Sequence, residues 1–373
     1  MRFDLTDEQE LMRDTARRFL EKAAPVAELR KPGEAMDVRA REIWRKGCEL
    51  GWAGLAAPES VGGFVLSGAL AQDLAVIAEE IGRLVAPGFL VPTAVGLQAL
   101  ALSDEHLEAL GPAMVAGEAL LAWAFGEPGN GWEPAGFQTR IEAAGEALIL
   151  DGAKAYVEGG ADAGAFVVTA RFGAGLSQVL VLADHPGVTV APARSLDLGR
   201  RFAEVRFNAV RLPASALLGS LGAAETQVER QLQLALLLQC AETNGAVARA
   251  YEFTVEYMGE RHAFGRPIVS YQALKHRLAD MLLWLHSCMA TTDAALAAYD
   301  AAAPEAGRLA RIAKTYVATK STQIMGDLVQ LTGGIAVTWE HDMHLYERRV
   351  AVNRAVFGAP EQHRAQVHRM IAA

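Results

Sequence analysis

Apolar residues recur at helical spacing through about the first 110 residues of the chain. Thr6 is expected to cap the first helix, and Gln9, three residues later, completes a capping box with it. Further helices are predicted over residues 40–50, 67–84 and 92–101, with turns rich in proline and glycine between them. We therefore predict an all-helical N-terminal domain over residues 1–115.

Between residues 116 and 222 the pattern changes to short apolar and β-branched runs, which turns such as Asp151-Gly152 and Pro186-Gly187 separate. The clearest predicted strands cover residues 147–150, 165–170, 178–183 and 188–191. Short strands joined by turns and flanked by helices predict a small antiparallel sheet or barrel inserted between helical domains. The step at Arg211-Leu212-Pro213 is expected to mark the exit from this middle domain.

From residue 223 onward the helical pattern returns in long segments rich in alanine and leucine. Helices are predicted over residues 223–262, 272–302 and 307–333, with a last one near 361–371. Segments of this kind usually form a four-helix bundle. The predicted fold class is therefore α+β, with a helical N-terminal domain (1–115), a small β middle domain (116–222) and a C-terminal four-helix bundle (223–373).

Composition narrows the class of protein. The 35 basic and 44 acidic side chains give a formal charge of −9 without a run of lysines or arginines, so nucleic acid is not expected as a partner. The acidic N-terminus lacks a secretory signal pattern, and the apolar runs are shorter than the roughly 18 to 20 residues of a membrane span. Cys48, Cys240 and Cys288 show no metal-ligand spacing, which favours buried, reduced thiols in a cytoplasmic protein.

The segment from Tyr257 to Ile268 is the most distinctive candidate site. Arg261 lies one helical turn after Tyr257 where a long helix is predicted to end, and Gln272 begins the next helix. A guanidinium beside an aromatic ring and a carboxamide suits a diphosphate with an attached adenosine. The alternative is a helical hairpin whose arginine only satisfies the last helical carbonyls.

A second candidate segment ends a predicted helix at Gln330 to Ala336. Gly333 and Gly334 have no side chains and would let a ligand approach the backbone. Ordinary glycine termination of a helix is the alternative, and the pattern alone favours it. His341 and His344 follow, but an i,i+3 pair of histidines without a third ligand indicates a polar helix end rather than a metal site.

Four motifs in order make the sequence resemble the acyl-CoA dehydrogenase family over essentially its whole length. They are Pro58-Glu59 with Gly62-Gly63, Arg211-Leu212-Pro213 with Leu217-Leu218-Gly219, and the Arg261 and Gln330 segments. The resemblance implies a noncovalent FAD and α,β-dehydrogenation of an acyl-CoA thioester. It further implies that FAD is held partly across a dimer interface, by Arg261, Phe264 and Gln272 of one chain and Gln330, Gly333 and Gly334 of another.

The middle domain departs from the family pattern. The loop Phe125 to Trp132 stands where the family has Thr-Glu-Pro-Gly-Ala-Gly-Ser, and Tyr156-Val157-Glu158 stands where it has Trp-Ile-Thr. Gly126, Trp132 and Glu158 thus replace hydroxyl residues that help hold flavin and substrate in the family. By position, the resemblance makes Phe125, Gly126 and Tyr156 candidate flavin contacts, and Trp132 and Gly358 candidate substrate contacts.

The catalytic base is also replaced. Removal of the α-proton of a thioester requires a positioned carboxylate and stabilisation of the developing enolate oxygen. The family's Tyr-Glu-Gly-Thr turn matches Val356-Phe357-Gly358-Ala359, with Phe357 at the glutamate, and the alternative location falls on Ala235. The nearest carboxylate on that helix is Glu242, about 10 Å or two turns further on. Glu242 is therefore the candidate base, and a structural ion pair or a ligand contact is its alternative role.

The segment from Val337 to Tyr346 with Arg348-Arg349, together with Ala241-Glu242, resembles a subgroup that acts on bulky, ring-bearing acyl-CoAs such as steroid side-chain thioesters. In that subgroup two unlike chains form an α2β2 heterotetramer. The resemblance implies an acyl-CoA substrate, a homologous partner chain or a homo-oligomer, and electron-transfer flavoprotein or a similar acceptor. The leading hypothesis is a subunit of an FAD-dependent acyl-CoA dehydrogenase. The alternatives are a non-catalytic structural subunit and a different flavin reaction on the same scaffold.

Overall fold

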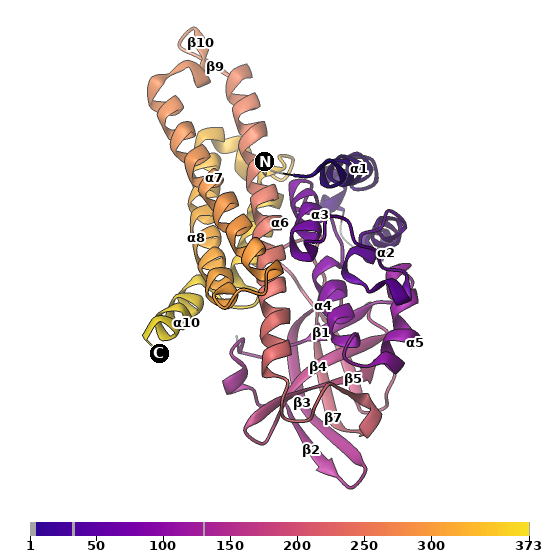
Figure 1. Cartoon of the computed structure of the whole chain (residues 1–373). Helices are drawn as coiled ribbons and strands as arrows, with labels where there is room; N and C mark the ends of the chain where they lie inside the picture. Colours follow the sequence, from indigo (N-terminus) through magenta and orange to yellow (C-terminus); the bar gives the residue numbers. More distant parts are fainter. Residues whose placement is uncertain (1–4, 32–33, 130, 373) are drawn as a thin grey trace.

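The computed structural model describes residues 5–31, 34–129 and 131–372. Its first part is helical, as predicted, and Figure 1 shows these helices along one side of the molecule. The capping box is confirmed, since Thr6 Oγ1 accepts from the Gln9 amide at 3.3 Å and Gln9 Oε1 accepts from the Thr6 amide at 3.2 Å. The helices are α1 (Asp7–Ala23), α2 (Glu34–Glu49), α3 (Leu70–Arg83), α4 (Leu90–Leu100) and α5 (Asp104–Val115).

The middle of the chain forms a twisted sheet below these helices (Figure 1). The strands are β1 (Leu121–Ala124), β2 (Arg140–Ala144), β3 (Ala147–Glu158), β4 (Ala165–Phe172), β5 (Gly175–Leu182), β6 (Val188–Ala193), β7 (Phe202–Pro213) and β8 (Leu217–Leu218). They lie in the order β6-β7-β3-β2-β4-β5-β8, with β1 against β4. Most pairs are antiparallel as predicted, but β1 pairs with β4 in parallel, and β2 meets β4 in parallel at one register pair.

The pattern did not predict β1, β2, β7 or β8. In β7 the buried positions are separated by exposed charged and polar side chains, such as Arg206 and Arg211, so no continuous apolar run marks this strand. β3 extends through Glu158, well beyond the predicted end at residue 150, and pairs with β7 along most of its length. This extension brings the segment 156–158 to the face of the sheet that meets the C-terminal helices.

The C-terminal part is a bundle of long helices that rises from the sheet (Figure 1). Its elements are α6 (Glu225–Glu260), the hairpin β9 (His262–Ala263) and β10 (Arg266–Pro267), α7 (Gln272–Asp300), α8 (Ala306–Thr332), α9 (Met343–Ala355) and α10 (Pro360–Ala372). α9 was not predicted. Its helical face contains the buried Arg349 and Asn353, which interrupt the apolar periodicity.

Two glycines fix where α3 crosses α6. A Cβ added at Gly82 would lie 1.9 Å from the backbone oxygen of Glu242, and one added at Gly245 would lie 2.0 Å from that of Glu79. The two helices therefore touch backbone to backbone, which places Glu242 at the junction of the N-terminal domain and the bundle. In the described part of the chain, no helix is long and apolar enough to cross a membrane.

Candidate cofactor and active site

Arg261 lies at the far end of the bundle from the sheet, directly after the last residue of α6. Its carbonyl accepts from the Ile268 amide at 2.8 Å, which closes the hairpin that connects α6 to α7. One guanidinium nitrogen, Nη1, donates to the Thr332 carbonyl at the end of α8 at 3.2 Å and lies 3.4 Å from the Tyr257 hydroxyl. The other two nitrogens of this exposed side chain donate to no acceptor within the described residues.

The remaining residues predicted for the cofactor's diphosphate end lie at the ends of the neighbouring helices, and Gly333 is the one that lies beside this arginine. Gln272 begins α7, Gln330 lies in the last turn of α8, and both are exposed. Gly333 ends α8 at φ +79°, and a Cβ added there would lie 3.1 Å from Arg261 Nη1. Glycine thus terminates the helix, as the alternative interpretation of this segment expects, and leaves room for the guanidinium of the same chain. The approach of a ligand to this backbone stays a prediction. Gly334, also exposed, follows directly.

Phe264 projects from the tip of the hairpin with 97% of its surface exposed. Its φ of +52° and the +81° of Gly265 give the two-residue turn a conformation that bulky residues rarely adopt. A large aromatic side chain held in this way contributes nothing to the core of its own chain. Its position suits contact with a ligand or another chain.

Tyr271 is a functional candidate that the sequence did not reveal. Its hydroxyl donates to the Ala263 carbonyl at 2.9 Å, and the Arg266 guanidinium lies 3.8 Å from the centre of its ring. These contacts brace the hairpin that carries Arg261 and Phe264. In the sequence, Tyr271 could be recognised only as an aromatic residue between two turns, and this pattern is too common to identify a functional residue.

The other predicted cofactor and substrate residues lie beside the middle of α6, where Leu238 and Glu242 line the neighbouring cavity. They meet where the middle domain contacts the bundle, and they are Phe125, Gly126, Trp132, Tyr156 and the turn before Gly358. Glu242 and Arg261 are separated by about 28 Å of α6 at 1.5 Å per residue. The two groups of predicted residues therefore form two separate places on one chain.

The loop that begins at Phe125 rests on a buried lysine that the sequence pattern did not indicate. Lys154 Nζ donates to the Phe125 carbonyl at 2.9 Å and to Glu127 Oε1 at 3.0 Å, and lies 3.7 Å from the centre of the Phe137 ring. Burial lowers the pKa of Lys154 to about 8, although Glu127 opposes the shift. A lysine on a strand of a half-exposed sheet is normally predicted to face water, so the sequence pattern does not predict that Lys154 is buried.

The turn that contains Phe357 and Gly358 is fixed by two buried groups. Lys314 Nζ donates to the Val356 carbonyl at 3.0 Å, and His363 Nε2 lies 3.0 Å from the Phe357 carbonyl. Burial, with nearby positive charges, lowers the pKa of His363 to about 3, so its imidazole is neutral and Nε2 donates. Gly358, at φ +109°, leaves the room that His363 occupies.

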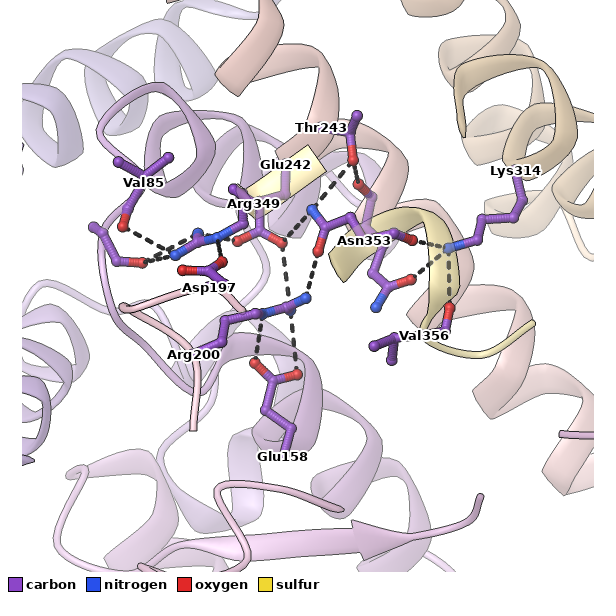
Figure 2. A network of polar contacts seen from close by, with 12 residues as sticks. Val85, Glu158, Asp197, Arg200, Glu242, Thr243, Lys314, Arg349, Asn353 and Val356 are labelled. Carbon is purple, nitrogen blue, oxygen red and sulfur yellow. Dashed lines mark hydrogen bonds and ion pairs between the residues drawn. The ribbon is translucent and has the colours of Figure 1, made fainter. Parts of the chain in front are cut away.

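Glu242 lies in a buried ionic cluster that joins all three domains (Figure 2). Its Oε1 accepts from Arg349 Nη1 at 2.6 Å, while Oε2 accepts from Asn353 Nδ2 at 3.1 Å and lies 3.4 Å from Arg200 Nη2. Burial opposes ionisation, but the two guanidinium groups and the hydrogen bonds outweigh it and lower the pKa of Glu242. Both carboxylate oxygens of Glu242 are engaged. This geometry fits the alternative role of an ion-pair partner, because a base needs an oxygen free to face the proton it removes.

The same cluster continues into the middle domain through Glu158, which occupies the family's threonine position. Arg200 binds its carboxylate through two nitrogens, with Nε 2.9 Å from Oε1 and Nη2 3.2 Å from Oε2. Burial raises the pKa of Glu158 to about 7, since the neighbouring Glu242 adds to the effect and Arg200 only partly offsets it. Glu158, Glu242 and Asp197 face the guanidinium groups of Arg200 and Arg349, so this set carries one excess negative charge.

Replacing Glu158 with glutamine is expected to change how stability depends on pH. Between its ordinary value of 4.5 and about 7, Glu158 binds a proton in the folded state but not in the unfolded state. Its contribution to stability therefore falls as pH rises through this range, by on the order of 3 kcal/mol. Thermal unfolding of both proteins from pH 5 to 8 should show a shallower decline for Glu158→Gln. Glu142→Gln, at an exposed site in the same sheet, is the control, and parallel curves for wild type and Glu158→Gln would refute the shift.

Comparisons with known proteins agree along the whole chain. Family models match the acyl-CoA dehydrogenase N-terminal domain over residues 6–118, the middle domain over 122–210 and the C-terminal domain over 213–372. Acyl-CoA dehydrogenase IpdE2 of Mycolicibacterium smegmatis is 30% identical over 369 residues, which cover 96% of this chain and 97% of that relative. The mitochondrial isobutyryl-CoA dehydrogenase of Dictyostelium discoideum is 27% identical over 95% of this chain and 87% of its own length.

Solved structures show the same architecture. A variant of the Tcur3481-Tcur3483 steroid ACAD superposes with a TM-score of 0.88 at 27% identity, over 98% of each chain. Butyryl-CoA dehydrogenase from Megasphaera elsdenii superposes with a TM-score of 0.88 at 21% identity, over 100% of each chain. At that identity the second match shows the fold alone.

Proposed function

The chain belongs to the acyl-CoA dehydrogenase family, and from this membership we propose that it is one subunit of an FAD-dependent enzyme. The other subunit is an unlike chain of the same family. The enzyme desaturates an acyl-CoA thioester between Cα and Cβ. The observation that carries the proposal is the exposed Arg261, whose Nε and Nη2 donate to no acceptor within the described residues. It lies beside the ends of three long helices, where a diphosphate can approach it from outside the molecule.

The residues at this end of the bundle fit the diphosphate and adenosine part of FAD. We propose that they do so across a dimer interface: the two available guanidinium nitrogens of Arg261 in one chain match anionic oxygens, and the exposed backbone at Gly334 of another chain stays accessible. Phe264 offers a flat apolar face to an adenine ring, and the carboxamides of Gln272 and Gln330 supply donors and acceptors. When bound, FAD supplies the acceptor for the hydride that leaves Cβ.

The chain's own residues do not supply the base. Phe357 and Ala235 occupy the two positions where the family places its carboxylate, and neither side chain can take a proton. Glu242 is buried with both oxygens bound by Arg349, Asn353 and Arg200. We therefore propose that Glu242 is a structural ion-pair partner and that the unlike chain provides the carboxylate that removes the α-proton.

Replacing Glu242 with glutamine separates these two roles. If Glu242 only pairs with arginines, Glu242→Gln lowers the unfolding temperature but leaves the kcat and pH profile of the assembled enzyme close to those of the wild type. If Glu242 is the base, turnover falls by a factor of about 1,000 or more while bound flavin stays constant. Steady-state kinetics on samples matched for flavin content, at a temperature where both proteins are folded, decides between the two outcomes.

The relatives suggest the class of acyl group. IpdE2 is an acyl-CoA dehydrogenase, and the solved Tcur3481-Tcur3483 protein is a steroid ACAD. Together with the segment from Val337 to Tyr346, this supports a bulky, ring-bearing acyl-CoA as the substrate. Electron-transfer flavoprotein or a similar carrier is the proposed acceptor of the electrons.

Co-expression tests the proposed function. The chain is produced alone and with a homologous chain that carries a carboxylate at either base position, and bound flavin and acyl-CoA-dependent dye reduction are measured. We expect flavin and dye reduction only in the two-chain complex. A fully active homo-oligomer with one flavin per chain would contradict the unlike partner. If the complex is active but Arg261→Gln leaves its flavin content unchanged, the chain is the non-catalytic structural subunit of the alternative hypothesis.

A further inference from the structure

We propose that the cleft between the N-terminal domain and the bundle, beside α6, binds a carboxylic acid with a bulky apolar body. The cleft has a volume of about 670 Å³, within the range of roughly 300 to 1,000 Å³ that is typical of small-molecule pockets. Its walls come chiefly from the short helix η1 (Val26–Arg30), from α6, and from the segment that leads from residue 340 into α9. Binding at this cleft is independent of the proposed function.

The cleft is separate from both places described above. Arg249, on its α6 wall, lies about 10 Å along the helix from Glu242 and about 18 Å from Arg261, at 1.5 Å per residue. The cleft shares no lining residue with the cavity beside Glu242 or with the one beside Phe357. It is therefore a site of its own.

One part of the cleft is aromatic and apolar. The ring centre of Phe253 lies 5.8 Å from that of His341 and 5.4 Å from that of Tyr346, and both pairs meet edge to face. Val26 and Leu84 add aliphatic surface from the N-terminal domain. Such walls favour a ligand with a ring or a branched apolar body, because contact with them removes apolar surface from water.

Two arginines line the cleft with nitrogens that have no acceptor. Arg30 Nη2 donates to Asp342, but its Nη1 and its buried Nε donate to nothing within the described residues. Arg249 donates through Nη1, at 3.3 Å to Glu252 and at 3.4 Å to Glu256, and its Nε and Nη2 find no acceptor in the part of the chain that the structure describes. Donors of this kind are normally satisfied, so these nitrogens indicate an oxygen-bearing ligand.

His341 supplies a third donor from the segment before α9. Its Nδ1 accepts from the Met343 amide at 3.1 Å, so the proton of the neutral ring lies on Nε2. Burial lowers the pKa of His341, which keeps the ring neutral at pH 7. Among residues 5–31, 34–129 and 131–372, Nε2 has no acceptor. A carboxylate, with two acceptor oxygens, suits a cleft lined by donors from three elements.

Charge decides between a carboxylate and a phosphate. The cleft is lined by two guanidinium groups and by the carboxylates of Glu21, Glu340 and Asp342, which leaves a net charge of −1. Asp342 is paired with Arg30, whereas Glu21 and Glu340 are exposed, so water and salt screen them. A phosphate monoester carries about −1.5 to −2 at pH 7 and would be repelled more than a carboxylate. The expected ligand is therefore a monoanion.

A matched set of naphthalene probes tests the site by isothermal titration calorimetry, on the full chain and on the two-chain complex. Naphthaleneacetate carries a carboxylate, naphthaleneacetamide has the same rings without the charge, and naphthyl phosphate carries the higher charge. We expect naphthaleneacetate to bind once per chain, and the other two probes to bind more weakly by a factor of about 10 or more. Hydrogen exchange with this probe bound should show protection of residues 25–30 and 340–346.

Two variants of the chain locate the binding. Arg249→Gln should weaken binding of naphthaleneacetate about 10-fold or more, because a charged donor to the carboxylate is lost. Arg206→Gln, at an exposed ion pair with Glu204 on the sheet, is the matched control and should bind as the wild type does. If Arg249→Gln does not fold, Phe253→Leu, which removes an aromatic wall, takes its place with the same expectation.

Absence of binding, or equal affinities for the carboxylate and amide probes, would overturn the proposal. Equal affinities of Arg249→Gln and the wild type would do the same. Tighter binding of naphthyl phosphate than of naphthaleneacetate would exclude the carboxylate class. Binding to the lone chain that disappears in the complex would also overturn it, because the unlike chain would then cover the cleft.

Discussion

Replacing Arg349 with methionine is expected to lower the free energy of unfolding by roughly 3 to 5 kcal/mol. The side chain is fully buried and donates to Glu242 at 2.6 Å, to Asp197, and to the carbonyls of Val85 and Ala86. Methionine fills most of the volume but leaves the buried Asp197 without its guanidinium partner and Glu242 with Arg200 alone. For a chain of this length the change corresponds to a fall in unfolding temperature of roughly 5 °C.

Differential scanning calorimetry on the isolated chain checks this expectation. Arg354→Met is the matched control, because Arg354 lies on the same helix and pairs with Glu361 at 3.0 Å on the surface. An exposed pair of this kind contributes at most about 1 kcal/mol. Equal unfolding temperatures for the two variants would show that the cluster does not hold the domains together.

Replacing Arg261 with glutamine is expected to weaken FAD binding by the two-chain complex about 100-fold or more. Each hydrogen bond from a guanidinium to a charged oxygen contributes on the order of 1.5 to 3 kcal/mol, and Arg261 has two nitrogens available for them. Titration of FAD into the flavin-free complex, followed by the change in flavin fluorescence, gives both dissociation constants. Arg308→Gln, at an exposed position near the opposite end of α8, should bind FAD as the wild type does. Equal affinities for Arg261→Gln and the wild type would remove this arginine from the cofactor site.

Much of the architecture follows from local patterns. The helices α6, α7 and α8 were predicted within a few residues because their apolar periodicity continues over many turns. α9 and β7 were missed for a common reason, since both carry charged residues inside the pattern. In α9 the interruption is Arg349, whose burial depends on partners more than 100 residues away in the sequence. A local pattern cannot reveal a charge that distant residues neutralise.

The residues of the candidate site also fall into those that the sequence predicted and those that only the structure revealed. Arg261, Gln272, Gln330 and Gly333 were identified in sequence, and each stands next to a helix end. Gly333 lies beside Arg261. The ionic cluster was not foreseen beyond Glu242. The replacements at Gly126 and Trp132 were visible as departures, but their mutual fit appears only when the indole is seen to occupy the space of a missing Cβ.

Native mass spectrometry of the complex that co-purifies with this chain from its own organism shows which chains it contains and how much FAD. We expect a particle that contains this chain, a second and unlike acyl-CoA dehydrogenase chain in equal number, and FAD that is lost when Arg261 is replaced. A particle made only of copies of this chain with one FAD each, or one without flavin, would contradict it.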